Sequence, residues 1–452
     1  MATDLIIIGS GPGGYRAALH AAQHGLQVVV VEKDEVGGTC LNCGCIPTKT
    51  LCRHAEIIDT LSQADVFGLQ NLSYNFDFSK VVERKNAVVA QLRSGVEQLM
   101  QSPGITLVRG RASFRDAHTI VVGEEEYTAR NIIIATGSHS KMPPIEGLGL
   151  NGVLTSTELL NLPTVPRRLC IIGAGVIGME FASVFSSFGS EVTVVEFLKE
   201  ALPVMDSDIA KRLRQTIARR GVDFHMQSAV KQIEEVLSED GSRHLRVIFE
   251  KKGKTLSADA DVVLVATGRA ANLEGLGLDA IGVETSRQGI VVDSNFQTNI
   301  DGIYAIGDVN GRCMLAHAAT MQGIHVVNRL LGEPDNMRLD IMPSAVFTHP
   351  EAAAVGKSED DCKREAIAYT CRKGHYRANG KALAMNETEG MVKLLLDEKQ
   401  HIIGCHAFGA HAADMVQEVA TLMNHHATAK QLADIVHIHP TLSEILHDLS
   451  LA

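Results

Sequence analysis

The sequence predicts an α/β fold with two similar parallel-sheet units followed by a C-terminal α+β unit. The first observation is an internal repeat, because residues 4–33 align with residues 168–197 at a constant offset. The second is a further pair of similar strands, NIIIATG at 131–137 and VVLVATG at 262–268. The third is a change of character after residue 339, beyond which no comparable Gly-rich turn recurs.

Each copy of the repeat reads as an apolar strand, a Gly-rich turn, a helix and a β-branched strand that ends in Glu. The aligned residues are Gly9 with Gly173, Gly11 with Gly175, Gly14 with Gly178, and Glu32 with Glu196. This is the pattern of a Rossmann-like dinucleotide-binding domain: the first Gly allows the tight turn, the second admits the pyrophosphate, and the third lets helix and strand pack closely. The terminal carboxylate accepts hydrogen bonds from ribose hydroxyls. Two Gly-rich turns that bind nothing are the alternative interpretation.

The regions that follow each repeat predict the rest of the two nucleotide units. Residues 105–127 and 222–256 are polar, rich in β-formers and carry turn signals. In the first of them, Gly110-Arg111-Ala112 is a small-residue turn that lets an adenine approach the backbone. The strand at 302–309 delivers Asp308 behind a Gly, where it either meets ribityl or phosphate groups or only starts a turn.

The C-terminal part predicts an α+β unit for association or for completing a site. Strands are expected at 345–355 and at 391–407, the second with a charged hairpin at 396–400. Helices are expected at 413–425 and 429–434.

Composition excludes several classes of function. The 452 residues carry a net charge of −11, which disfavours nucleic acid and anionic membranes as partners. No apolar run approaches the roughly 18–20 residues of a membrane helix. The apolar residues 5–8 lack the flanking regions of a signal peptide, so a cytoplasmic location is expected.

Cysteines cluster in the motif GGTCLNCGCIPTK at 37–49. If this stretch is helical, the side chains of Cys40 and Cys45 diverge, so a disulfide between them needs a distorted first turn. A low thiol pKa is expected near a helix N-terminus. Three interpretations compete: a redox-active pair Cys40–Cys45, a metal site of Cys40, Cys43 and Cys45, and inert buried thiols. A second Cys/His cluster with ligand spacing is missing from the sequence, so no metal is expected.

Together these motifs resemble the flavoprotein pyridine nucleotide-disulfide oxidoreductases, and among them the dihydrolipoamide dehydrogenases. The resemblance also rests on ATGR at 266–269, GD at 307–308, MLAH at 314–317, PSAVFTHPEAAAVG at 343–356 and HIHPTLSE at 437–444. It implies an FAD-binding domain at 1–147 completed by 271–338, an NAD-binding domain at 148–270 and a dimerisation domain at 339–452.

The resemblance assigns roles to individual residues. It places Cys45 nearest the flavin and Cys40 toward the substrate, with Lys49 and Glu180 paired near the flavin N5. His439 becomes the acid–base, oriented by Glu444 and serving the partner subunit. The residues expected to contact FAD or NAD are Gly9, Gly11, Gly14, Glu32, Lys49, Ala112, Thr136, Gly137, Asp308 and Ala316, and Gly173, Gly175, Gly178, Glu196, Val230 and Gly268.

Structural roles are the alternative for several of these residues. His439 alone reads as a satisfied core histidine, and Glu444 completes a Thr441-x-x-Glu444 capping box. Lys49 and Glu180 read as solvated helix charges. Two features depart from the family pattern and stay unassigned: the third thiol, Cys43, and the stretch 318–322, where the family often carries acidic residues.

The implied activity is oxidation of protein-bound dihydrolipoamide with NAD as acceptor, through FAD and the Cys40–Cys45 disulfide. The implied partners are a second copy of the chain and the lipoylated carrier or acyltransferase core of a 2-oxo acid dehydrogenase complex or glycine cleavage system. The alternatives are reduction of another disulfide with NAD(P)H and an inactive flavin-binding scaffold. Glu196 disfavours NADP, since its charge opposes a 2′-phosphate.

Overall fold

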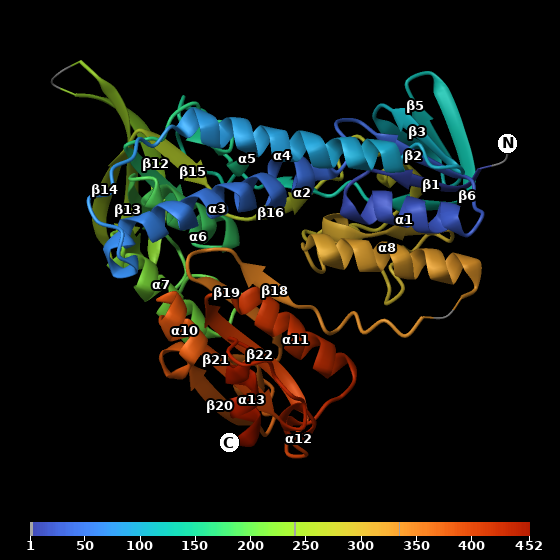
Figure 1. Ribbon diagram of the computed structural model, residues 1–452. Helices are drawn as coiled ribbons and strands as arrows, with labels where there is room; N and C mark the ends of the chain where they lie inside the picture. The colour runs from blue at the N-terminus through green and yellow to red at the C-terminus, as the bar shows by residue number, and fades with distance from the viewer. Residues whose placement is uncertain (1–2, 239–240, 334) are drawn as a thin grey trace. The chain divides into compact units, whose positions relative to one another are not determined.

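A computed structural model of the protein describes residues 3–238, 241–333 and 335–452 (Figure 1). The chain divides into two compact units. Unit 1 comprises Met1–Thr50, Ser79–Lys141 and Gly268–Leu339, and unit 2 comprises Leu51–Phe78, Met142–Thr267 and Asp340–Ala452. The finer division into three domains stays a prediction.

Unit 1 is built on a mixed sheet with the strand order β3-β2-β1-β6-β5-β4, and β17 pairs with β6. The strands around β1 are parallel, and β4 and β5 are antiparallel additions. The bounds are β1 Thr3–Ile8, β2 Val28–Glu32, β3 Ile105–Arg109, β4 Ala112–Asp116, β5 Thr119–Val122, β6 Glu125–Ile134 and β17 Ile303–Ala305.

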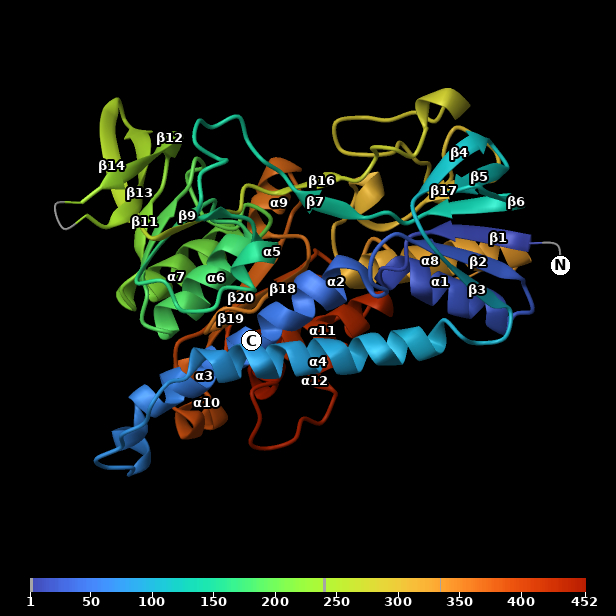
Figure 2. The ribbon, with the colours of Figure 1, turned by 90° about the horizontal axis from the view of Figure 1, so that it is seen from above.

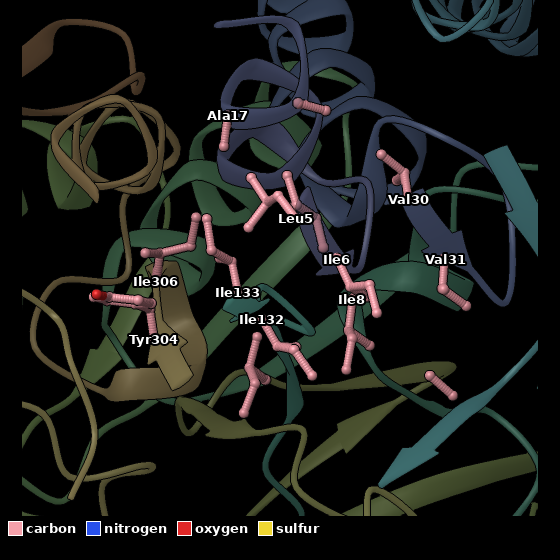
Figure 3. Packing of buried hydrophobic residues seen from close by; sticks show 14 of the residues in the cluster. Leu5, Ile6, Ile8, Ala17, Val30, Val31, Ile132, Ile133, Tyr304 and Ile306 are labelled. Atoms are coloured by element: carbon pink, nitrogen blue, oxygen red, sulfur yellow. The ribbon is translucent and has the colours of Figure 1, made fainter. Parts of the chain in front are cut away.

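The central strands of this sheet are continuous apolar runs, because parallel strands are covered on both faces. Leu5, Ile6 and Ile133 are fully buried. Figure 3 shows their side chains packed with Ala17 of α1 and with Tyr304 of β17.

Helices α1 (Pro12–Gln23) and α8 (Ala316–Leu331) lie side by side in unit 1 (Figure 1). Glycines allow this approach, since a Cβ on Gly323 would lie 2.9 Å from the carbonyl oxygen of Gly13. The other elements of this unit are α2 Gly38–Cys43, the short strand pair β7 Ser138–Ser140 and β16 Arg269–Ala271, and the 3-10 turns η2 Asp279–Ile281 and η3 Gly307–Asn310. Helices α3 (Cys45–Ser62) and α4 (Phe78–Leu99) have residues in both units.

Unit 2 contains a parallel sheet with the order β11-β10-β9-β15-β8 and an antiparallel sheet β12-β13-β14 (Figure 2). The parallel strands are β8 Val153–Leu154, β9 Arg168–Ile172, β10 Glu191–Val195, β11 Asp223–His225 and β15 Val262–Val265. The antiparallel strands are β12 Ser228–Leu237, β13 Arg243–Lys251 and β14 Lys254–Ala260. The helices here are α5 Ser156–Leu159, α6 Val176–Ser187 and α7 Ser207–Arg219, with η1 Ala64–Phe67 after α3.

The C-terminal part of unit 2 is an antiparallel sheet with the order β18-β19-β22-β21-β20. Its strands are β18 Ser344–Val346, β19 Glu351–Gly356, β20 Thr370–His375, β21 Met391–Leu396 and β22 Ile402–Gly409. The helical elements are α9 Glu359–Arg364, η4 Tyr376–Ala378, α10 Gly380–Met385, α11 Ala412–Asn424, α12 Ala429–Ala433 and α13 Glu444–Leu451.

The predicted α/β class with a C-terminal α+β unit is confirmed. The strand predicted at 345–355 is wrong as one element, because β18 ends at Val346 and β19 begins at Glu351. The intervening backbone instead bonds to α6, where the amide of Phe347 donates to Glu180. In the described part of the chain, no helix is long and apolar enough to cross a membrane.

Candidate functional site

The first and third glycines of each turn are required by the protein's own backbone. Gly9 and Gly173 have φ values of +103° and +108°, in the region that favours glycine. A Cβ on Gly14 would lie 1.9 Å from the carbonyl oxygen of Gly9, and one on Gly178 would lie 2.0 Å from that of Gly173. Any side chain at Gly14 or Gly178 would therefore overlap the preceding turn.

The middle glycines, Gly11 and Gly175, have no such requirement. Their φ values of −66° and −74° suit any residue. A Cβ on Gly175 would meet no atom of the described residues within 4 Å, and one on Gly11 would meet only the Cα of Gly38, at 3.9 Å. Each stands at the N-terminus of a twelve-residue helix, where backbone N–H groups face outward. A cofactor pyrophosphate fits this open space and these donors.

The two acidic residues at the strand ends are held beside the turns by equivalent contacts. Glu32 accepts hydrogen bonds from the amide of Ser10 (2.8 Å) and from the amide of Asp34 (2.9 Å). Glu196 accepts from the amides of Ala174 (2.6 Å) and Leu198 (2.7 Å), which are the aligned positions of the repeat. Both carboxylates are thus buried, fixed in orientation and suited to accept from ribose hydroxyls.

Asp308 lies in η3, just after β17. Its carboxylate contacts Ser138 of β7 and Arg269 of β16. The Ser138 hydroxyl donates to Asp308 at 2.5 Å, and the Nε of Arg269 donates to the same hydroxyl at 2.7 Å. The Gln322 amide oxygen accepts from the Gly307 N–H (2.8 Å) and so ties this turn to α8. Asp308 is therefore more than the start of a turn. No sequence motif singled out Ser138, whereas the ATGR motif includes Arg269.

The remaining residues expected at the cofactors occupy loops and strand ends. The amide of Gly110 donates to the backbone oxygen of Glu32 at 2.9 Å, which brings the start of β4, Ala112, toward the first turn. Ala316 is the first residue of α8, whose N-terminus has no side-chain cap. Thr136 and Gly137 follow β6, Gly268 precedes β16, and Val230 lies half-buried on β12.

The cysteine motif is divided between two helices. Cys40 lies on α2 and Cys45 begins α3, with Gly44 between them. A Cβ on Gly44 would lie 2.9 Å from the carbonyl oxygen of Thr39, so glycine allows the chain to fold back tightly at this point. The helix break removes the divergence expected for residues five apart, and the side chains of Cys40 and Cys45 form a hydrogen bond.

Electrostatics in the cysteine motif differ from the low pKa that helix position alone predicts. The hydrogen bond to Cys45 and burial raise the pKa of Cys40, while the charge of Lys49 acts in the opposite direction. Lys49 follows Cys45 by one helical turn. In the reduced pair, Cys40 therefore holds its proton more strongly than an ordinary thiol.

Asn42 anchors the loop and was not singled out from the sequence. Its amide donates to the backbone oxygens of Val36 (2.9 Å) and Gly38 (3.0 Å), and its side-chain oxygen accepts from Arg93 (2.8 Å). Cys43 is half-buried at the end of α2. Among the described residues there is no group of three His, Cys, Asp or Glu side chains able to hold a metal ion.

Glu180 is buried on α6, and its carboxylate accepts from the amide of Phe347 at 2.9 Å. The interpretation of Glu180 as a solvated helix charge is therefore wrong. Its pairing with Lys49 stays a prediction, since the two residues belong to different units.

His439 and Glu444 form the expected pair in the C-terminal part. The imidazole Nδ1 lies 2.9 Å from Glu444 Oε1, and the amide of Thr441 donates to Glu444 Oε2 at 2.7 Å. The backbone hydrogen bond from Thr441, followed by that of His439, lowers the pKa of Glu444. The His439 side chain is 82% exposed, which excludes a core histidine. The Thr441 hydroxyl donates to Ile438 instead of capping α13, so only half of the capping box forms.

Comparisons with known proteins agree with this architecture. Residues 3–323 match the family model described as pyridine nucleotide-disulphide oxidoreductase, and residues 342–450 match its dimerisation domain. The chain is 38% identical over 451 residues to the dihydrolipoyl dehydrogenase of Chlamydia muridarum, covering 98% of this chain and 95% of that protein. The identity to the Bacillus subtilis dihydrolipoyl dehydrogenase is 38% over 466 residues, covering 99% and 97%. The solved structure of the HOCl-induced flavoprotein disulfide reductase RclA from Escherichia coli superposes with a TM-score of 0.88 at 32% identity, covering 99% of each chain.

Proposed function

Because this chain belongs to the pyridine nucleotide-disulphide oxidoreductase family, we propose that it oxidises protein-bound dihydrolipoamide to lipoamide with NAD as acceptor. The chain is an oxidoreductase, and its cofactors are FAD and NAD. The observation that carries the proposal is the break between α2 and α3, which brings Cys40 and Cys45 into hydrogen-bond contact in a chain with two dinucleotide turns.

The cysteine pair exchanges with the substrate by two thiolate attacks. One substrate thiolate attacks the Sγ of Cys40 in the Cys40–Cys45 disulfide, which forms a mixed disulfide and releases the Cys45 thiolate. The second substrate thiolate attacks the other substrate sulfur, which is bonded to Cys40 in the mixed disulfide; this closes the lipoamide ring and releases the Cys40 thiolate. The substrate loses two electrons and two protons, and the cysteine pair gains the electrons. When bound, FAD supplies the two-electron carrier between this pair and NAD.

His439 takes up one of the two protons that the substrate thiols lose, and the reduced cysteine pair keeps the other. Its Nδ1 is held by Glu444, which fixes the ring and stabilises the imidazolium, so that Nε2 faces outward as the base. The exposure of His439, together with the exposed side chains of Val436 (94%) and Ile438 (79%), suits a surface that a second subunit covers. His439 of one subunit then serves the cysteines of its partner in a homodimer.

The partner that delivers the substrate is a lipoylated carrier protein or acyltransferase core of a 2-oxo acid dehydrogenase complex or glycine cleavage system. The names of the relatives support dihydrolipoamide as the substrate. The fixed, buried carboxylate of Glu196 supports NAD, because a 2′-phosphate would place like charge against it.

A second candidate function is reduction of another disulfide with NADH. The likeness to RclA, a disulfide reductase, favours it. The two candidates use the same cysteine pair and differ in the substrate and in the direction of electron flow.

Steady-state kinetics separates them. Purified holoenzyme is assayed by absorbance at about 340 nm for NADH formation from dihydrolipoamide and NAD, and for NADH consumption with glutathione disulfide and other disulfides. We expect kcat/KM for dihydrolipoamide to exceed kcat/KM for any of the disulfides at least about a hundredfold. Cys45→Ser is the inactive control, and Cys52→Ser, outside the redox pair, is the matched control that retains activity. A higher kcat/KM for another disulfide would replace the first candidate with the second.

A further inference from the structure

The segment between β18 and β19 carries a histidine at the centre of a charged network in unit 2. The amide of His349 donates to the Ser183 hydroxyl on α6 at 3.1 Å, and its backbone oxygen accepts a hydrogen bond from Arg220. Its ring lies between two carboxylates: Nδ1 is 2.8 Å from Asp59 on α3, and Nε2 is 3.1 Å from Glu387 after α10. One residue thus joins α3, α6, the residue that follows α7 and the segment that follows α10.

Only a protonated imidazole donates from both ring nitrogens, and both partners here are acceptors. Arg220 also pairs with Asp59 and donates to the Ser187 hydroxyl at 3.1 Å. The network therefore holds two positive and two negative groups and is neutral as a whole when His349 is charged. Burial opposes that charge, but the hydrogen bonds to Asp59 and Glu387 outweigh it and raise the pKa of His349 to about 9.

The same backbone segment fixes Glu180. Phe347, two residues before His349, donates its amide to the Glu180 carboxylate at 2.9 Å, and Glu180 and Ser183 are one turn apart on α6. Phe347 and His349 therefore bind successive turns of one helix face. Movement at His349 would displace the amide that orients Glu180.

We propose that His349, as an imidazolium held between Asp59 and Glu387, is a positioning residue that sets the orientation of the Glu180 carboxylate. The proposal rests on the proposed role of Glu180 beside the flavin and extends it to a residue that contacts no cofactor. The groups that face His349 are Asp59, Glu387 and Arg220. Loss of its proton leaves two carboxylates against one guanidinium, which loosens the segment that carries Phe347.

The test follows flavin reduction by NADH in the holoenzyme by stopped flow, from pH 6 to pH 10. The variants are Glu180→Gln, His349→Gln and Glu387→Gln. His401→Gln is the matched control, because His401 also pairs with one aspartate, Asp397, but on the β21–β22 hairpin. The flavin absorption spectrum and the thermal unfolding midpoint of each variant are recorded over the same pH range.

His349→Gln should slow flavin reduction by about tenfold to a hundredfold at pH 7, in the direction of Glu180→Gln. The wild-type rate should fall as the pH rises through about 9, and His349→Gln should lack this alkaline limb. Glu387→Gln should move the limb to lower pH, since one of the two carboxylates that favour the proton is gone. If His349 had only a structural role, its replacement would lower the thermal unfolding midpoint but would not change the pH at which the rate of flavin reduction falls.

Two results overturn the proposal. In the first, His349→Gln reduces flavin at the wild-type rate and with the wild-type pH profile, while Glu180→Gln is slowed. That result would leave the role of Glu180 intact but remove the role of His349. The other is an unaffected rate in Glu180→Gln. Failure of the proposed function is distinguishable, because it shows as absent dihydrolipoamide turnover in the wild type while the effect of His349→Gln on flavin reduction persists.

Discussion

The two glycines of the second turn provide a paired test of which positions serve the protein and which serve the cofactor. At Gly175 a Cβ meets no described atom within 4 Å, and at Gly178 it would lie 2.0 Å from the Gly173 carbonyl oxygen. Gly175→Ala should therefore change the free energy of unfolding by less than about 1 kcal/mol, the scale of a Gly-to-Ala change at a helix cap. It should weaken NADH binding by at least about tenfold, or ~1.4 kcal/mol, because the methyl occupies the approach of the pyrophosphate.

Gly178→Ala should mainly lower the free energy of unfolding, whereas Gly175→Ala mainly weakens NADH binding. The overlap must be relieved by moving α6 from β9, and overpacking of this kind costs about 1–3 kcal/mol of unfolding free energy. Denaturant unfolding without NADH measures stability, and quenching of NADH fluorescence measures affinity. FAD content should stay at the wild-type level in Gly175→Ala. If Gly175→Ala is destabilised as strongly as Gly178→Ala while it binds NADH normally, Gly175 serves the protein backbone and not the cofactor.

Three further predictions concern coenzyme choice, a buried ion pair and the shared site. The wild-type kcat/KM for NADH should exceed that for NADPH at least about tenfold, and Glu196→Ala should narrow the ratio; a wild-type preference for NADPH would contradict the ribose role of Glu196. The side chains of Lys393 and Asp206 are each 1% exposed and 2.7 Å apart, and Lys393 also pairs with Glu359. Lys393→Met should therefore cost about 3–5 kcal/mol in denaturant unfolding, because it leaves the buried Asp206 carboxylate without a cation, and adding Asp206→Asn should restore part of this loss. Heterodimers of Cys45→Ala and His439→Ala chains should regain dihydrolipoamide turnover, up to about one site per dimer, while each homodimer stays inactive; verified heterodimers without any activity would rule out a site shared between subunits.

The repeated βαβ segments could be predicted from the sequence because their causes are local. The apolar runs at β1 and β9, the turn glycines and the terminal Glu residues fall at fixed spacings. The structure places them as expected, except that Glu32 ends β2 whereas Glu196 lies one residue beyond β10. The roles of Glu32 and Glu196 in binding ribose stay predictions, but their equivalent backbone contacts follow directly from the repeat.

The rest depends on contacts between residues far apart in the chain. Ser138 meets Asp308 across 170 positions, and Phe347 meets Glu180 across 167 positions. A pattern of neighbouring residues in the sequence cannot predict either contact. The same cause accounts for the error at 345–355, where a strand-like sequence leaves the sheet because its amides bind α6.

A single anaerobic turnover tests most directly whether the Cys40–Cys45 pair passes electrons from dihydrolipoamide to NAD. Holoenzyme is mixed with excess dihydrolipoamide-bearing carrier domain, excess carrier is removed, NAD is then added, and the NADH formed is counted per flavin. We expect about one NADH per flavin in the wild type, formed with the two electrons that the reduced Cys40–Cys45 pair stores, and none in Cys40→Ser. A wild-type enzyme that retains its flavin but forms no NADH, or a Cys40→Ser enzyme that forms as much NADH as the wild type, would show that the cysteine pair does not carry the electrons from dihydrolipoamide to NAD.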